Sequence, residues 1–347
     1  TTQATAADPF DLVDYMGYPV PTAKQYRTGT AATDTHYRAR IKHVRLDLVH
    51  AHGPFSAGRE ALRLSRVRKI PLIATFHSKY YDDFYKATKS ETISKLVLSN
   101  IISFYNRCQD VWAVSESTAD VLRGYGYKGV IRIMPNGVTP RQASPGAVQA
   151  LETEYALDDR PVLLFVGQIN WKKNLLRVLE ACALLKKEGQ PFYLILAGQG
   201  PDEKAVRQKA EDLDLSDVLI MTGHVSKASK LDALYRRADL FVFPSLYDNA
   251  PMVVREASVM GTPSVLVRGS DAAEVIRDGQ NGLLCQDDAA DLAHVIGEAL
   301  KDREALRLLG DAARSSIPVP WTDIGQSIVD AYQEVLQNHS PTPANHV

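Results

Sequence analysis

Two carboxylates, Asp248 and Glu256, stand eight residues apart around the expected start of a helix. The N–H groups of the first turn, near Met252 and Val253, together with the positive end of the helix dipole, make a site for a phosphate or diphosphate. Glu256 lies about one turn further along, where it could accept hydrogen bonds from two ribose hydroxyls. The same pattern also fits a capped helix with a solvated acid on either side, so the acid pair alone does not establish a site.

The elements around these acids form a strand–loop–helix–strand unit. The apolar residues 240–243 predict a buried parallel strand, and a polar loop follows it. Pro251 suits the first position of a helix, with Asn249 as its cap, and the helix is expected to end before Gly261. A second buried strand is expected at residues 264–267. The loop therefore lies at the carboxyl end of a strand, where open α/β sheets bind their ligands.

A pair of lysines, Lys172 and Lys173, follows the expected strand at residues 162–166 and lies near the start of the next helix. A solvated lysine pair is one interpretation. A cation at a helix N-terminus is electrostatically unfavourable, however, unless an anion binds there. This charge placement favours the functional interpretation.

Three histidines stand at expected strand ends. His50 and His52 are two residues apart, so both rings would lie on one face of a strand, as a metal site might require. The sequence offers no third ligand beside them, and we interpret them as strand-end residues. His77 follows the expected strand at residues 71–75. A lone histidine at such a place is more often a hydrogen-bonded loop residue than a catalytic one.

The composition is that of an ordinary globular protein with room for two cores: 347 residues, 45% hydrophobic and 23% charged. A net charge of −1 gives no basic field, which argues against a nucleic-acid binder. The three cysteines are isolated and show no metal or redox spacing, which fits a reducing, cytoplasmic compartment. No apolar run approaches a membrane-spanning length, and we find no secretory signal.

Strands alternate with helices along the chain, which predicts parallel, doubly wound sheets. The first domain is expected to hold strands at residues 46–50, 71–75, 110–114 and 131–134. The second is expected to hold strands at residues 162–166, 193–197, 218–222, 240–243 and 264–267. The turn-forming and proline-rich residues 135–145 would link them. The expected fold class is α/β, with two Rossmann-like domains that face each other across a cleft.

Several of these segments together resemble the retaining GT-B glycosyltransferases of family 4 (glycosyl transferases group 1). The pattern Pro-Ser-x-x-Asp/Glu-(x)7-Glu-Ala, followed by Gly-x-Pro, matches the chain from Pro244 to Pro263. Residues 135–138 are similar to the family's Pro-Asn-Gly-Val/Ile segment, with Thr139 in place of the usual Asp. The resemblance extends from about Asp47 to about Leu336.

The resemblance implies a donor-binding domain at residues 139–317. Residues 1–138 would form the acceptor-side domain, completed by a crossover helix at 318–338, and residues 339–347 would be a disordered tail. The family opens with a strand and a Gly-Gly loop that this sequence does not show, since Gly17 and Gly29 are isolated. We therefore expect either a trimmed sequence or a reduced first domain without its opening units.

The resemblance also assigns roles to single residues. Lys173 would bind the donor diphosphate, with Gln168 where the family has Arg, and Glu256 would hold the ribose. Asp248 and His77 would flank the transferred sugar. The catalytic candidates are thus His77, Lys173 and Asp248, and the donor-binding candidates are Gly167, Gln168, Lys173, Val225, Asn249, Met252, Val253 and Glu256. No metal and no cofactor are expected, because the family needs neither.

The expected activity is metal-independent transfer of a hexose, with retention, from a nucleoside-diphosphate sugar to a hydroxyl. UDP is the commoner nucleotide in the family, and GDP is the alternative. The basic segment at residues 59–69 would suit peripheral contact with the inner membrane face, and with it a lipid or cell-envelope glycan acceptor. Two other interpretations stay open: a catalytically weakened nucleotide-sugar-binding protein, which Gln168 favours, and a sugar-nucleotide epimerase of the same architecture.

Overall fold

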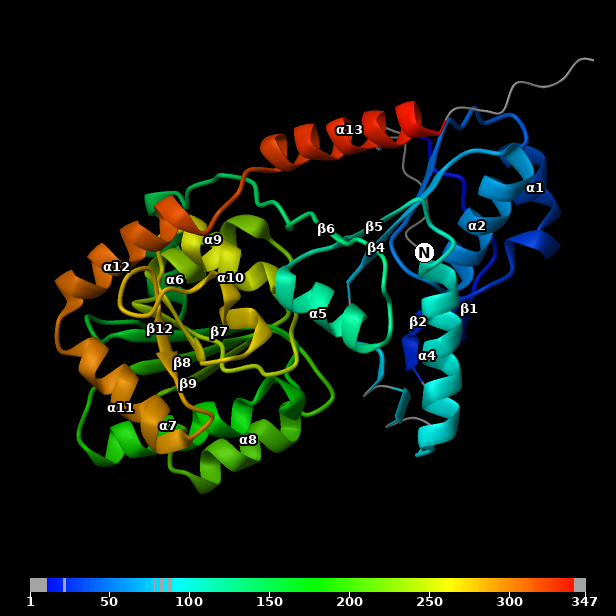
Figure 1. Ribbon diagram of the computed structural model, residues 1–347. Coiled ribbons are helices and arrows are strands. Elements are labelled where there is room, and N and C mark those ends of the chain that lie inside the picture. Colours follow the sequence, from blue (N-terminus) through cyan, green and yellow to red (C-terminus); the bar gives the residue numbers. More distant parts are fainter. Residues whose placement is uncertain (1–10, 21–22, 78, 82–83, 86–88, 340–347) are drawn as a thin grey trace, which may run out of the picture. The chain divides into compact units, whose positions relative to one another are not determined.

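The computed structural model describes residues 11–20, 23–77, 79–81, 84–85 and 89–339 (Figure 1). The chain divides into two compact units. The first comprises Thr1–Met134 and Gln326–Val347, and the second comprises Pro135–Gly325. The division falls after residue 134, where the sequence analysis puts the boundary after residue 138, and the chain returns to the first unit inside its last helix.

The first unit is built on a four-stranded parallel sheet whose strands follow one another in the order β3-β4-β5-β6. These strands are Val49–Ala51, Leu72–Phe76, Asp110–Ala113 and Arg132–Ile133. The connecting helices are α2 (Ser56–Arg68), α4 (Glu91–Tyr105) and α5 (Glu116–Gly124). Before the sheet come an antiparallel hairpin of β1 (Tyr18–Val20) and β2 (Ala23–Thr28), the 3-10 turn η1 (Ala31–Thr33) and helix α1 (Thr35–Ile41).

The last helix, α13 (Trp321–Asn338), packs against this sheet through its carboxy-terminal half. Tyr332 stacks on Trp112 of β5, which is 1% exposed, with ring centroids 5.6 Å apart. Arg132 of β6 pairs with Glu334 at 2.8 Å. All of β4 is buried, as expected of a parallel strand that is covered on both faces. The apolar composition of the central strands therefore places them in the core of the first unit.

The second unit contains a six-stranded parallel sheet with the strand order β12-β11-β10-β7-β8-β9. In chain order these strands are Val162–Val166, Tyr193–Ala197, Leu219–Gly223, Leu240–Val242, Ser264–Val267 and Leu283–Cys285. The order reverses between β7 and β10, because the chain adds β8 and β9 on one side of β7 and then β10 on the other. Ligands of open α/β sheets bind at such a reversal, outside the carboxyl ends of the strands.

Helices cover both faces of the larger sheet, with α7, α8 and α11 on one face and α6, α9 and α10 on the other (Figure 1). Their bounds are α6 Pro145–Glu154, α7 Leu175–Lys187, α8 Glu203–Asp212, α9 Ala228–Arg237, α10 Met252–Val259 and α11 Ala289–Leu300. The 3-10 turns η2 (Trp171–Lys173) and η3 (Asp271–Val275) and helix α12 (Arg303–Ser316) complete the unit. Strands β7, β8, β10 and β11 are buried throughout and form the centre of its core.

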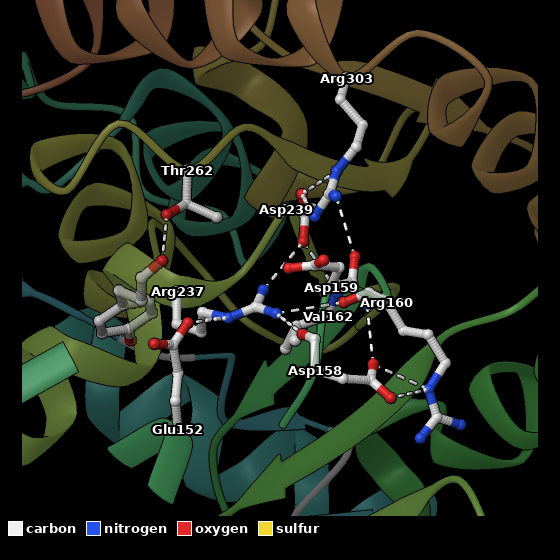
Figure 2. A network of polar contacts seen from close by, with 10 residues as sticks. Glu152, Asp158, Asp159, Arg160, Val162, Arg237, Asp239, Thr262 and Arg303 are labelled. Atoms are coloured by element: carbon white, nitrogen blue, oxygen red, sulfur yellow. Dashed lines mark hydrogen bonds and ion pairs between the residues drawn. The ribbon is translucent and has the colours of Figure 1, made fainter. Parts of the chain in front are cut away.

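A polar network ties together the amino-terminal ends of β7 and β10 (Figure 2). Asp239, just before β10, accepts the N–H of Val162 at 2.9 Å and binds the guanidinium group of Arg303 at 2.8 Å. Arg237 donates to the carbonyl oxygen of Asp158 at 2.7 Å. These contacts hold the amino-terminal ends of the two strands together.

The clearest differences from the expected elements concern where they begin. The first strand of the smaller sheet is Val49–Ala51 instead of residues 46–50. Helix α10 begins at Met252, so Pro251 is its N-cap and Asn249 is not. Helix α13 begins at Trp321 and not at residue 318, because residues 319 and 320 run extended beside Val138. The expected tail beyond residue 339 lies outside the described residues.

Candidate functional site

The loops that follow β7 and β10 meet at the carboxyl edge of the larger sheet, where the strand order reverses. The ammonium group of Lys173, on the first loop, lies 2.5 Å from Oδ1 of Asp248, on the second. Asn174 adds another link, since its side-chain amide donates to the carbonyl oxygen of Pro244 at 3.1 Å. Two of the three catalytic candidates are therefore in direct contact.

Lys173 ends the short turn η2, which neighbouring side chains hold in place. Asn170 caps this turn by accepting the N–H of Lys172 at 2.9 Å. Asp202, which follows the Gly-Gln-Gly-Pro segment after β8, accepts the N–H of Trp171 at 2.9 Å. The Lys173 side chain is 17% exposed, so part of it lies at the surface.

Asp248 is held through its second oxygen as well. The hydroxyl of the fully buried Ser245 donates to Oδ2 at 2.6 Å and accepts the N–H of Tyr247 at 3.3 Å. The Tyr247 ring lies 5.1 Å from the ammonium group of Lys172 and 6.0 Å from that of Lys173. Two lysines therefore lie beside Asp248 at the reversal of strand order, and their ammonium groups suit an anionic ligand.

A glycine lets the loop after β8 approach the loop after β7. A Cβ atom at Gly198, whose φ is +147°, would lie 1.8 Å from the carbonyl oxygen of Gly167. The N–H of Gly167 donates to the carbonyl oxygen of Ala197 at 3.0 Å, which holds the two segments together. Gly167 is thus fixed between the strands, whereas the side chain of its neighbour Gln168 is exposed.

Glu256 lies on α10 and is bound from two other segments. The hydroxyl of Tyr235 on α9 donates to Oε2 at 3.1 Å, and Nη2 of Arg141 lies 3.7 Å from Oε1. Arg141 is itself held at 2.7 Å by Asp232, also on α9. Burial, and then the charge of Glu256, raises the pKa of Tyr235 well above its usual range, so this hydroxyl stays protonated. The Glu256 side chain is 23% exposed and remains accessible to a ligand.

The remaining donor-binding candidates lie at the same edge of the sheet. Met252 and Val253 form the first turn of α10, and their side chains pack against the core of the second unit. The N–H groups of a first helical turn have no acceptor within the helix, which suits an anion at this end. Asn249 is half-buried in the loop before the helix. Val225 follows β9, the edge strand, which β8 separates from β7.

The third catalytic candidate, His77, belongs to the first unit and follows β4. Its Nε2 lies 3.0 Å from Nδ1 of His52, which follows β3. The His52 ring stacks on His50 with ring centroids 4.4 Å apart, so the two side chains share a face as expected. Among the described residues, no group of three or more His, Cys, Asp or Glu side chains is arranged to hold a metal ion.

Three residues that hold the candidates were not identified from the sequence: Ser245, Tyr235 and Arg141. Ser245 belongs to the Pro-Ser pattern, which marked a strand end and gave the hydroxyl no role. Tyr235 has the pattern of a core residue on an amphipathic helix, and Arg141 that of a solvated charge in a linker. The roles of Tyr235 and Arg141 depend on how α9 packs against α10, which no local sequence signal reports.

Two family models match the chain. The model described as Glycosyl transferases group 1 matches residues 150–316, and the model described as Glycosyltransferase Family 4 matches residues 3–142. Each falls largely within one of the two units. The chain belongs to the family 4 glycosyltransferases. The enzyme class that the sequence predicts, a glycosyltransferase, is thereby confirmed.

This glycosyltransferase is similar to several known proteins. It is 28% identical to the alpha-monoglucosyldiacylglycerol synthase of Streptococcus pneumoniae over 266 residues, which cover 75% of this chain and 60% of that enzyme. It is 23% identical to the alpha-D-kanosaminyltransferase of Streptomyces kanamyceticus over 347 residues, or 94% of this chain and 86% of that enzyme.

Among solved structures, Anabaena Alr3699/HepE in complex with UDP has a TM-score of 0.75 at 19% identity, over 86% of this chain and 82% of that one. The same protein in complex with UDP-glucose has a TM-score of 0.75 at 18% identity, over 88% and 83%. The likeness confirms the GT-B fold class.

Proposed function

We propose that this glycosyltransferase moves a hexose from a UDP-sugar to a hydroxyl acceptor, with retention of the anomeric configuration. The observation that carries the proposal is the contact between Lys173 and Asp248 at the reversal of strand order. A cation suited to a diphosphate thus lies beside a carboxylate suited to sugar hydroxyls. A protein that bound only a nucleotide would need the cation but not the carboxylate.

The proposed mechanism relies on groups that are fixed before the reaction begins. Departure of the nucleoside diphosphate builds negative charge on the β-phosphate. Lys173, the Gln168 amide and the first-turn N–H groups of α10 stabilise this charge without a metal ion, by preorganised electrostatics. Glu256, which Tyr235 orients, accepts hydrogen bonds from the ribose hydroxyls. Asp248 orients the sugar for front-face attack by the acceptor.

The comparisons support particular substrates. Similarity to HepE, which was solved with UDP and with UDP-glucose, supports UDP as the nucleotide. Similarity to a monoglucosyldiacylglycerol synthase supports a lipid hydroxyl as the acceptor.

Over the ranges that the structure describes, no helix is both long and apolar enough to cross a membrane. The exposed side chains of Ile93 (48%) and Leu96 (67%) on α4 support peripheral contact with a lipid surface from the cytoplasmic side.

Calorimetric titration of the purified chain tests the donor. We expect saturable binding of UDP and its hexose conjugates in the presence of EDTA, with GDP weaker by about tenfold or more, which is about 1.4 kcal/mol. The variant Glu256→Ala should lose much of this affinity. Tighter binding of GDP, or binding that requires a divalent cation, would contradict the proposal.

A transfer assay then tests the acceptor and the stereochemistry. The chain is incubated with the UDP-sugar that binds best and with vesicles that contain diacylglycerol or a monoglycosylated diacylglycerol. We expect a new glycolipid whose anomeric proton signal shows the configuration of the donor. Transfer to a soluble saccharide but to neither lipid would contradict the lipid acceptor, and an inverted product would contradict retention.

A nucleotide-sugar-binding protein with weakened catalysis is the second candidate, because Gln168 replaces the expected arginine and its side chain is exposed. The substitution removes one positive charge and a bidentate donor from the diphosphate segment. The variant Gln168→Arg distinguishes the candidates. A rise of turnover from an undetectable to a measurable level would favour the weakened protein, whereas clear turnover by the unmodified chain would exclude it.

A further inference from the structure

Asn174 connects three loops at the carboxyl edge of the larger sheet. It follows Lys173 at the end of η2 and precedes α7. Its side-chain nitrogen lies 3.1 Å from the carbonyl oxygen of Pro244, just past β10, and 2.7 Å from Oδ1 of Asp287, just past β12. Both partners are acceptors, which identifies the contacting atom as the amide nitrogen. The loops after β7, β10 and β12 are therefore joined through one uncharged side chain.

The backbone of Asn174 lies in the left-handed region, with a φ of +61° and a ψ of 28°. Its N–H donates to the carbonyl oxygen of Trp171 at 3.0 Å, and its own carbonyl oxygen accepts the N–H of Arg177 at 3.0 Å. Glycine adopts such a conformation most readily, and asparagine tolerates it. A glycine would satisfy this turn but would make neither side-chain hydrogen bond, so the backbone conformation alone does not account for the amide contacts.

Two links join the loops after β7 and β10, and they differ in charge. The first is the ion pair of Lys173 with Asp248 at 2.5 Å. The second is the hydrogen bond of Asn174 to Pro244. Ser245, the next residue after Pro244, holds the other oxygen of Asp248 at 2.6 Å, so both links end in the same short segment. A diphosphate competes with Asp248 for the ammonium group, whereas the amide link does not use that group.

We propose that Asn174 is a positioning residue that keeps the Lys173 ammonium group beside Asp248 and the diphosphate site. The proposal deepens the proposed function and rests on it, because it assumes that Lys173 binds the diphosphate. The amide holds the loop of Lys173 against the end of β10 while the lysine exchanges the carboxylate for phosphate oxygens. Without the amide this loop is less restricted, and ordering the lysine on the nucleotide costs more conformational entropy. All of these contacts lie within the second unit.

The variant Asn174→Gly separates the amide from the turn. It removes both side-chain hydrogen bonds and keeps the backbone conformation, because glycine adopts a positive φ without strain. Asp214→Gly is the matched control, since Asp214 also has a positive φ (+55°) and its side chain contacts Lys186 at 3.1 Å. Asp214 lies between α8 and β9, at the amino edge of the sheet and so away from the site. A melting curve for each variant shows whether it is folded.

Calorimetric titration with UDP provides the first readout. We expect Asn174→Gly to weaken UDP binding roughly threefold to tenfold, the range for the net effect of one hydrogen bond. In the Lys173→Met background the same substitution should change the affinity by less than about twofold, because no ammonium group is left to position. Asp214→Gly should bind UDP like the unmodified chain. Equal losses in the two backgrounds would overturn the proposal in favour of a general structural role, and an unchanged UDP affinity in Asn174→Gly would overturn it outright.

Urea unfolding provides a second readout that needs no nucleotide. A double-mutant cycle with Lys173→Met and Asp248→Asn gives the coupling between the two side chains, first in the unmodified chain and then in Asn174→Gly. We expect a favourable coupling in the unmodified chain and at most roughly half of it in Asn174→Gly. The same coupling in both chains, or none in the unmodified chain, would overturn the proposal. An amide-dependent coupling in a chain that binds no nucleotide would instead refute the proposed function and leave the positioning of Lys173 beside Asp248 established.

Discussion

The ammonium group of Lys173 lies 2.5 Å from Oδ1 of Asp248, although the two residues are 75 positions apart in the chain. They meet because β7 and β10 are neighbours at the reversal of strand order. Ser245 holds the other oxygen of Asp248 at 2.6 Å. The cation that we assign to the diphosphate therefore already has a carboxylate partner in the chain itself. A nucleotide must share this cation with Asp248 or displace it.

This competition predicts opposite effects on binding and on turnover when the carboxylate is neutralised. In Asp248→Asn the Lys173 ammonium group loses an anionic partner, so we expect UDP affinity to stay equal or to rise by up to about 1 kcal/mol. Turnover with the UDP-sugar should fall, since the sugar loses a charged acceptor. Calorimetry with UDP and a transfer assay measure the two effects. A clear loss of UDP affinity would show that Asp248 supports the nucleotide instead of competing for its cation.

Removal of the cation itself should weaken nucleotide binding. Lys173→Met keeps much of the side-chain volume and removes a charged hydrogen bond, so we expect UDP to bind more weakly by about 1.5–3 kcal/mol. Lys172→Met is the control, because Lys172 is its exposed neighbour and contacts the same Tyr247 ring. If both variants lose affinity equally, the effect is one of general positive charge and Lys173 has no special role. If neither does, the diphosphate lies elsewhere.

Tyr235 provides a test of the ribose contact that leaves Glu256 in place. Tyr235→Phe removes the hydroxyl that donates to Oε2 at 3.1 Å, so we expect UDP affinity to fall by about 0.5–1.5 kcal/mol. The loss should disappear with 2′,3′-dideoxy-UDP, because that ligand lacks the hydroxyls that Glu256 would bind. Tyr193→Phe is the control, since its hydroxyl donates to Ala156 instead. A loss of the same size with the dideoxy ligand would assign Tyr235 to packing alone.

These three predictions concern contacts between residues that are distant in the chain, which local sequence patterns do not predict. The buried strands were predicted well, because a run such as Val162–Val166 needs only its own apolar side chains to be recognised. The pairing of Lys173 with Asp248 required knowledge of the strand order, and strand order depends on contacts that are distant in sequence. Asn249 has a good capping side chain, but Pro251 fixes the extended backbone at the N-cap and moves the helix start past it.

Gly198 predicts a large effect on stability from a single added methyl group. Its Cβ would lie 1.8 Å from the carbonyl oxygen of Gly167, so the backbone of one loop must move. We expect Gly198→Ala to lower stability by about 3 kcal/mol or more, in the range of severe steric changes. Gly189→Ala is the control, because Gly189 also has a positive φ (+76°) and a Cβ there has open space among the described residues. Gly189→Ala should lower the free energy of unfolding by about 1–2 kcal/mol, because only the backbone conformation is unfavourable there. Scanning calorimetry compares the two, and equal shifts in melting temperature would contradict the steric argument.

The half-buried histidine His50 predicts how stability depends on pH. Burial, and then the neighbouring His52 and His77, lowers the pKa of His50 from 6.5 to about 3. Between these values the unfolded chain binds a proton that the folded chain does not, so stability falls as the pH decreases from 6.5. One such group changes the free energy of unfolding by at most about 1.4 kcal/mol per pH unit within this window, and it does not change this free energy above the window.

The variant His50→Gln isolates this contribution, because glutamine does not titrate. Above pH 7 the variant should be less stable than the unmodified chain by a constant amount, since it loses the contacts with Tyr332 and Thr75. As the pH falls from 6.5 towards 4, only the unmodified chain loses stability by keeping His50 neutral in the folded state. The difference in free energy of unfolding between the two chains should therefore become smaller. Urea unfolding at several pH values measures the free energy of unfolding of each chain. A difference that stays constant or widens as the pH falls would contradict the lowered pKa of His50 in the folded chain.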